Sequence, residues 1–116
     1  MKIKVGFVTN SSSTAYIIAN ISDKPKDLID FVYENPEIIE DYVEEYLWED
    51  EDRTKYTQQM LLRSAKENNK KFEPGEAQYC IFGDEDRTLI GRVFEYMLRN
   101  GGSSKSFTWY FSESLR

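Results

Sequence analysis

Residues 34–52 combine a regular apolar stripe with an uninterrupted acidic face. Apolar residues recur there at helical spacing, at Ile38, Ile39, Tyr42, Val43, Tyr46 and Leu47. This spacing places them on one side of a helix, which we expect over about residues 36–49, with Asn35 as its cap and Pro36 in its first turn. Because such a stripe is stable only when it is buried, the chain must fold around a core that covers it.

The charge of this segment differs from that of the rest of the chain. Residues 34–52 contain ten acids and no base, whereas residues 1–33 sum to +1 and residues 53–116 to +3. Carboxylates four residues apart on a helix repel each other by about 0.2–0.5 kcal/mol per pair. A solvated helix face usually mixes both signs. The charge therefore favours a surface that recognises a basic partner, and an ordinary solvated face is the alternative.

The remaining pattern predicts a small α+β fold. Residues 2–8 alternate between polar and apolar, and residues 14–21 are β-prone and largely apolar, which predicts the two strands of a hairpin. Residues 77–82 predict a buried strand, and residues 107–112 predict an aromatic strand. Three more helices are expected after caps at Ser22 or Asp23, at Thr54 and at Asp86. The order is β-β-α-α-α-β-α-β. We predict a single domain, 1–116, with about four helices on a small antiparallel or mixed sheet of about four strands.

Composition excludes several kinds of chemistry. The chain has no histidine and one cysteine, Cys80, so it has no Ser-His or Cys-His pair, no internal disulfide and no multi-cysteine zinc site. Cys80 lies in the middle of a predicted strand, where an inert core thiol is expected. We therefore expect no enzyme activity and no cofactor.

The sequence also bears on location and on the kind of partner. No run approaches the roughly 20 apolar residues that span a bilayer. The apolar run at the start is too short for a secretory signal, so a cytoplasmic protein without a membrane partner is expected. A net charge of −6 argues against direct binding to a nucleic-acid backbone.

The segment Gly6-Phe7-Val8-Thr9-Asn10 followed by three serines is an unusual opening. It resembles the start of a group of short, uncharacterised phage and prokaryotic proteins, which begin with a strand, then Phe-Val-[Ser/Thr]-Asn and a serine run. The resemblance covers about ten residues. It implies a phage or mobile-element source, hence a host cytoplasm, and it carries no activity. This chain departs from the pattern at Thr14, where the serine run ends.

Two polar clusters offer alternatives to the acidic helix. Backbone and hydroxyl donors at Asn10, Ser11, Ser12, Ser13 and Thr14 are able to hold a phosphate or nucleotide, although a structural turn explains them better. Asp84 and Asp86 are able to bind Mg²⁺ together with Glu113 or the acidic helix, although carboxylates at a helix start are also ordinary caps.

The sequence favours a non-enzymatic acidic binding protein, phage-encoded, that engages the basic, nucleic-acid-binding surface of a host protein as a nucleic-acid mimic. An anti-CRISPR or anti-restriction inhibitor is its concrete form. The predicted partner-binding residues are Glu37, Glu40, Asp41, Glu44, Glu45, Trp48, Glu49, Asp50, Glu51 and Asp52. Two alternatives stay open: a small nucleotide- or Mg²⁺-dependent enzyme, and a phage structural or assembly subunit that forms a homodimer.

Overall fold

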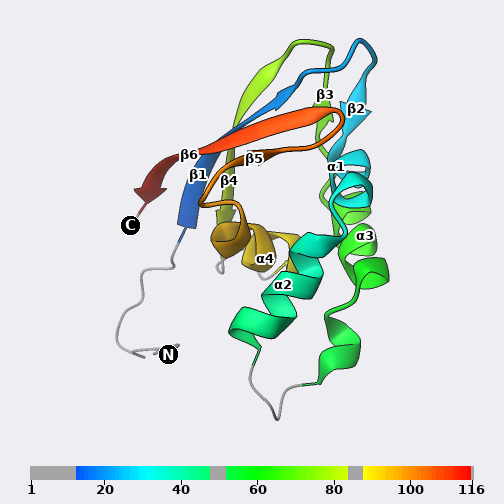
Figure 1. The fold of residues 1–116 in the computed structure, drawn as a ribbon, viewed down its shortest axis with the longest axis vertical. Helices are drawn as coiled ribbons and strands as arrows, with labels where there is room; N and C mark the ends of the chain where they lie inside the picture. Colours follow the sequence, from blue (N-terminus) through cyan, green and yellow to red (C-terminus); the bar gives the residue numbers. More distant parts are fainter. Residues whose placement is uncertain (1–12, 48–51, 84–87, 116) are drawn as a thin grey trace.

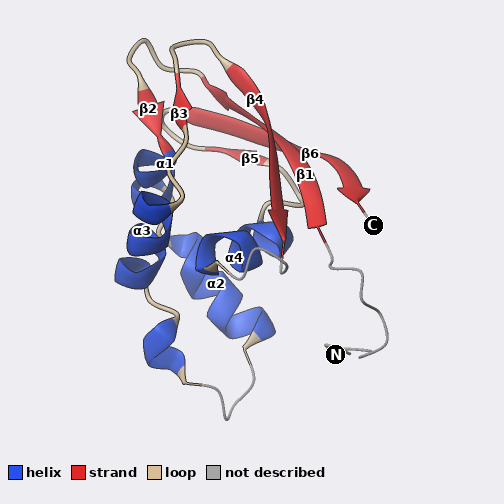
Figure 2. Cartoon of the chain, turned by 180° about the vertical axis from the view of Figure 1, so that it is seen from behind, coloured by secondary structure: helices blue, strands red, loops and turns tan. Residues whose placement is uncertain are grey.

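The computed structural model describes residues 13–47, 52–83 and 88–115. Figures 1 and 2 show a twisted sheet with the helices gathered on one of its faces. The elements are β1 (Ser13–Asn20), β2 (Lys26–Asp27), α1 (Leu28–Glu34), α2 (Glu37–Tyr46), a 3₁₀ turn η1 (Arg53–Lys55), α3 (Gln58–Glu67), β3 (Lys71–Phe72), β4 (Ala77–Gly83), α4 (Leu89–Met97), β5 (Gly102–Ser103) and β6 (Phe107–Leu115). The predicted α+β class and element order are confirmed.

The main sheet has the order β4-β1-β6-β5, and each neighbouring pair is antiparallel. β1 lies in the centre, with β4 hydrogen-bonded along one edge and β6 along the other. β4 and β6 therefore run in the same direction on either side of β1, and α4 lies between them in the chain. The first arm of the predicted hairpin, residues 2–8, lies outside the described residues.

The two faces of the sheet have different surroundings. Tyr16 and Ile18 of β1 point into the helix layer and are fully buried, whereas Ile17 between them faces the other way. Phe31 of α1 closes the core from the helix side, with its ring centroid 5.1 Å from that of Phe107 and 4.9 Å from that of Trp109 in β6. Each fully buried aromatic contributes about 1.5–3 kcal/mol, so this face carries much of the stability.

The helix α4 lies directly against β4 and β1. Ile90, Val93 and Phe94 form its buried stripe. Gly91 allows the close approach, because a Cβ there would lie 2.7 Å from Thr88 Oγ1 and 2.9 Å from the Gly83 carbonyl oxygen. A glycine that weakens the isolated helix therefore lets this helix pack against the end of β4.

The first helix begins later than the sequence predicts. Its cap is Asp27, whose side chain accepts from Asp30 N–H at 3.0 Å, while the Asp30 carboxylate accepts from Asp27 N–H at 3.0 Å. The expected caps Ser22 and Asp23 are wrong. Ser22 Oγ donates instead to Asn20 Oδ1 at 2.7 Å, which holds a turn before the short sheet of β2 and β3.

Three other helix starts also differ from prediction. The Asn35 side chain donates to the Phe31 carbonyl oxygen at 2.9 Å, so it closes α1 and does not cap α2. Thr54 lies in η1, and α3 starts after Thr57, whose hydroxyl accepts from the N–H of Met60. The cap of α4 is Thr88, and Asp86 lies outside the described residues.

The strand β4 was predicted to be buried, and this is wrong for half of its side chains. Tyr79 is 45% exposed and Ile81 is 48% exposed, whereas Cys80 and Phe82 between them are buried. The physical reason is that β4 is an edge strand with helices on one face only. An apolar run of this length does not reveal whether one face or both are covered.

Candidate functional site

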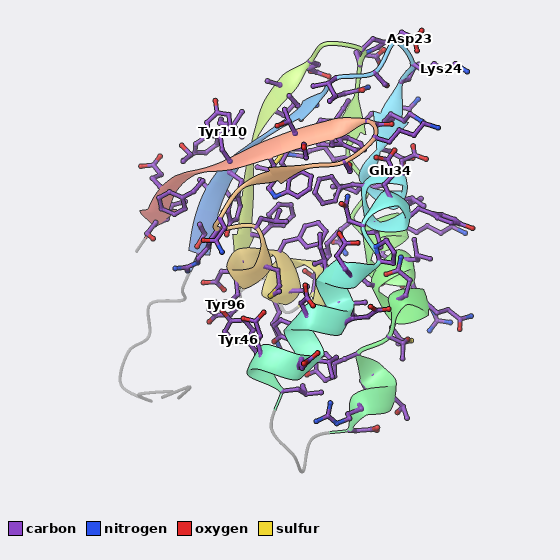
Figure 3. The ribbon with its side chains drawn as sticks, in the orientation of Figure 1. Asp23, Lys24, Glu34, Tyr46, Tyr96 and Tyr110 are labelled. Atoms are coloured by element: carbon purple, nitrogen blue, oxygen red, sulfur yellow. The ribbon has the colours of Figure 1, made fainter. Side chains whose placement is uncertain are left out.

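Two acids of the 34–52 block stabilise the fold. The Glu34 carboxylate accepts from Ser104 Oγ at 2.8 Å and from Ser106 N–H at 2.9 Å, which ties α1 to the segment before β6 (Figure 3). Burial alone would raise the pKa of Glu34, but these hydrogen bonds outweigh it, and the pKa lies below its usual value. Glu34 is therefore a structural carboxylate.

Asp52 also has a structural task. Its carboxylate accepts from Thr54 N–H at 3.0 Å and from the Thr54 hydroxyl, and so caps η1. The Thr54 hydroxyl and N–H lower the pKa of Asp52. Asp52 was predicted to bind a partner. Its capping of η1 is sufficient to explain why a carboxylate stands at this position.

The five acids on α2 differ from these two. Their side chains are exposed, and none forms a hydrogen bond or ion pair with another described residue. They are Glu37, Glu40, Asp41, Glu44 and Glu45. The predicted helix thus presents the predicted carboxylates to solvent, and in the described part of the chain none of them has a structural partner. We call these five residues the acidic face of α2.

The opposite side of α2 is fixed by the core. Ile38, Ile39 and Tyr42 are buried. The Tyr42 ring stacks on Tyr46 with centroids 5.5 Å apart and on Tyr56, which follows η1, with centroids 6.0 Å apart. Both the first and the last turn of α2 are therefore packed against other parts of the protein, so the acidic face has a defined position.

The tyrosine stack continues from α2 to α4. The Tyr46 and Tyr96 rings are 5.1 Å apart with an interplanar angle of 29°, and both labels lie together in Figure 3. The Arg99 guanidinium lies 5.5 Å from the centre of the Tyr96 ring. Stacked aromatic pairs contribute about 0.5–1.5 kcal/mol beyond their burial, so this stack fastens the acidic helix to the sheet-packed helix.

The other predicted partner-binding residues, Trp48, Glu49, Asp50 and Glu51, lie outside the described residues. The helix itself ends at Tyr46, three residues earlier than predicted. The predicted binding surface is therefore described for its helical part only.

The serine-rich opening is described only at its end. Ser13 and Thr14 begin β1 and are buried, while Asn10, Ser11 and Ser12 lie outside the described residues. The Thr14 hydroxyl accepts from Arg99 Nη2 at 3.1 Å. Thr14 therefore belongs to the packed end of the sheet, and the phosphate-loop hypothesis stays a prediction for the residues before it.

The carboxylate metal site at Asp84 and Asp86 stays a prediction. Asp84 and Asp86 lie outside the described residues. Glu113 lies on the open face of β6, where its carboxylate accepts from the Tyr79 hydroxyl at 2.6 Å. In the ranges that the structure describes, no three acidic or cysteine side chains gather as metal ligands.

Cys80 is the buried thiol that the sequence predicts. It is 1% exposed and lies on the inner face of β4. Burial raises the pKa of the thiol, and the positive charge of Lys70 offsets part of that rise. A protonated, enclosed thiol is a poor nucleophile, so Cys80 contributes packing.

Sequence reasoning missed a second exposed surface, on the sheet. Tyr79 and Ile81 of β4 and Tyr110 of β6 project from the face without helices, and Tyr110 points away from the helix layer in Figure 3. Tyr79 and Tyr110 flank Ile17 in one cross-strand row. The sequence carries no signal for this surface, because tyrosine and isoleucine at the exposed positions alternate with cysteine and phenylalanine at the buried ones.

The chain matches no protein-family model, no curated protein sequence and no solved structure. Among the helices that the structure describes, none has the length and apolar composition needed to cross a membrane.

Proposed function

We propose that this chain is a binding protein whose acidic face of α2 engages a basic surface on a partner protein. The observation that carries the proposal is the division among the acids of residues 34–52. Glu34 ties α1 to the segment before β6 and Asp52 caps η1, whereas the five carboxylates of the acidic face have no structural partner among the described residues. Repeated like charge on a helix costs stability, so a use outside the fold explains it best.

A basic surface of this kind is typical of proteins that bind nucleic acid. Carboxylates on a rigid helix would occupy such a surface in place of phosphates and would speed its encounter through long-range attraction. The specific form that we propose is inhibition of a host nucleic-acid-binding protein in the cytoplasm, for example a CRISPR or restriction effector. This form rests on the acidic face together with the resemblance of residues 6–14 to phage proteins.

The test is a binding measurement against a panel of purified CRISPR and restriction effectors and other nucleic-acid-binding proteins. We expect at least one of them to bind the chain and to release a labelled DNA or RNA when it does so. Affinity should fall when salt rises from about 0.1 M to about 1 M, because the screening length shrinks from about 10 Å to about 3 Å.

A matched pair of triple variants separates the acidic face from net charge. The first changes Glu40, Asp41 and Glu44 to the corresponding amides, and the second does the same to Asp23, Glu67 and Glu73, which are exposed elsewhere. Each variant removes three negative charges from two glutamates and one aspartate. We expect only the first to weaken binding, by tenfold or more. Equal binding by the first variant and the wild type, or no binder in the panel, contradicts the proposal.

A further inference from the structure

The direction of the hydrogen bonds in β1 determines which groups of β4 face outward. At the end of β1, Asn20 N–H donates to the Glu76 carbonyl at 2.9 Å, on the β4 side. The next residue, Ile21, donates to the Ser106 carbonyl at 2.8 Å, on the β6 side. Since successive residues of a strand direct their N–H and C=O groups to opposite edges, even-numbered residues of β1 bond to β4 and odd-numbered residues bond to β6.

The same alternation continues in β4, which lies at the edge of the sheet. Gln78 and Cys80 pair with Ile18 and Tyr16, so their backbone groups are used inside the sheet. The N–H and C=O groups of Tyr79 and Ile81 therefore point away from β1. Among the described residues no other backbone or side chain bonds to them. A row of free donors and acceptors on an extended strand is complementary to one kind of partner, another extended backbone.

A hollow of about 240 Å³ lies beside this edge, on the helix side of the sheet. Its lining includes Leu28, Lys70, Cys80, Phe82 and Ile90, from α1, the segment after α3, β4 and α4. It is smaller than the roughly 300–1,000 Å³ of a typical small-molecule site and has the size of one or two side chains. The lining combines apolar side chains with the polar side chains of Asn68, Thr88 and Lys70, and the Lys70 ammonium is its cation.

A strand added along β4 would contact both faces of the sheet beside it. Alternate side chains of a strand point to opposite faces. One side chain of the added strand would enter the hollow, and its neighbours would cover the exposed side chains of Tyr79 and Ile81. A single extended segment thus accounts for the free backbone groups, for the hollow and for the two exposed apolar side chains of an edge strand.

We propose that β4 accepts an extended peptide segment of a partner protein as an additional strand, with an apolar side chain in the hollow and a carboxylate near Lys70. A second copy of this chain fits less well. In a β4-to-β4 pairing the inward side chains of the second copy, Cys80 and Phe82, are buried in that copy's own core and are not free to enter the hollow. This site is separate from the acidic face of α2 and does not depend on it.

The probe is a displayed library of random ten-residue peptides, selected on the immobilised full-length chain. We expect enriched sequences with apolar residues at alternate positions and an acidic residue beside them. Binding of a synthesised peptide should slow hydrogen exchange at the Tyr79 and Ile81 amides. Methylation of the peptide nitrogens that face β4 should weaken binding at least tenfold, whereas methylation of the alternate nitrogens should leave it unchanged.

Variants of the protein test the same geometry. Ile81→Pro removes an outward N–H that the ladder with β1 does not use, so the fold should tolerate it and peptide affinity should fall at least tenfold. Lys70→Glu should weaken binding of acidic peptides by a similar factor. Tyr110→Ser, on the same open face but two strands away from the β4 edge, is the control and should bind as the wild type does.

Three outcomes overturn the proposal. One is a library without enriched sequences. Another is an enriched peptide that binds equally well whether the nitrogens facing β4 or the alternate nitrogens are methylated. This comparison uses the wild-type protein, so it holds even if Ile81→Pro fails to fold. The third is a dimer of the free chain that Ile81→Lys dissociates, because the occupant of the edge would then be a second copy.

Discussion

Tyr16 shows how one buried residue joins the sheet to the helix layer. Its hydroxyl donates to the Glu95 carbonyl oxygen of α4 at 2.6 Å, and its ring lies 6.3 Å from both Phe82 and Phe111. The side chain is fully buried, and burial raises the pKa of Tyr16 to about 12. A tyrosinate in this position would be shielded from water and would have no hydrogen to donate to the Glu95 carbonyl, so the folded state strongly prefers the neutral form.

The raised pKa predicts a specific loss of stability in alkali. The unfolded chain releases the Tyr16 proton near pH 10 and the folded chain near pH 12. The contribution is therefore complete below pH 10 and is lost as the pH rises from 10 to 12, with a slope of up to about 1.4 kcal/mol per pH unit. Tyr16→Phe also removes one hydrogen bond, which costs about 0.5–1.5 kcal/mol.

Urea unfolding of the wild type and Tyr16→Phe measures this effect. We expect the variant to be less stable at pH 8 and the difference to shrink steadily above pH 10, since phenylalanine has no proton to lose. Tyr110→Phe, on the exposed sheet face, serves as the control and should follow the wild-type pH dependence. A Tyr16→Phe profile parallel to the wild type across this range would contradict the assignment.

At the scale of elements, two aspartates lie near the start of α1, and substituting each of them tests which one is the cap. The Asp27 carboxylate accepts from Asp30 N–H and also from Asn69 Nδ2 at 3.1 Å, whereas Asp23, one of the two caps expected from the sequence, is exposed. Asp27→Ala should therefore lower the free energy of unfolding by about 1–2 kcal/mol. Asp23→Ala is the matched control and should stay within about 0.5 kcal/mol. Urea unfolding that gives the two variants equal stability would mean that Asp27 is not the cap.

Element types could be predicted from the sequence where the apolar period is long. The α2 stripe, the α4 stripe and the alternation of Phe107 and Trp109 each bury the side chains that the pattern indicates. Helix starts were less predictable, because several capping residues stand close together and long-range contacts choose among them. Asn69, 42 residues away along the chain, supports Asp27 as the cap.

At the scale of the whole molecule, the order of the strands in the sheet determines which side chains and backbone groups of β4 are exposed, and the sequence alone does not give that order. Placing β4 at an edge exposes Tyr79 and Ile81 and leaves one row of its backbone groups without a partner among the described residues, although residues 77–82 read as an ordinary buried strand. The acidic face of α2 was predictable, because its charge and its period are both local. The β4 edge was not, since it depends on β1 entering the sheet between β4 and β6.

The acidic face also has an energetic consequence for the free protein. Glu40 and Glu44 lie four residues apart, Asp41 lies three before Glu44, and Glu37 is close to both Glu40 and Asp41. Each such pair costs about 0.2–0.5 kcal/mol, while the favourable dipole interaction of Glu40 in the first turn recovers about 0.3–1 kcal/mol. Changing Glu40, Asp41 and Glu44 to amides should therefore stabilise the unbound chain by about 0.5–1 kcal/mol at low salt.

This gain should disappear near 1 M salt, where charges on the surface are screened beyond about 3 Å. Urea unfolding at low and high salt measures it, and the triple amide variant of Asp23, Glu67 and Glu73 is the control, because those exposed acids do not share one helix face. A chain that becomes more stable but loses its partner would show that the carboxylates are retained for binding. If the α2 variant is instead less stable than the wild type at low salt, the carboxylates support the fold, and the argument that they serve a partner loses its basis.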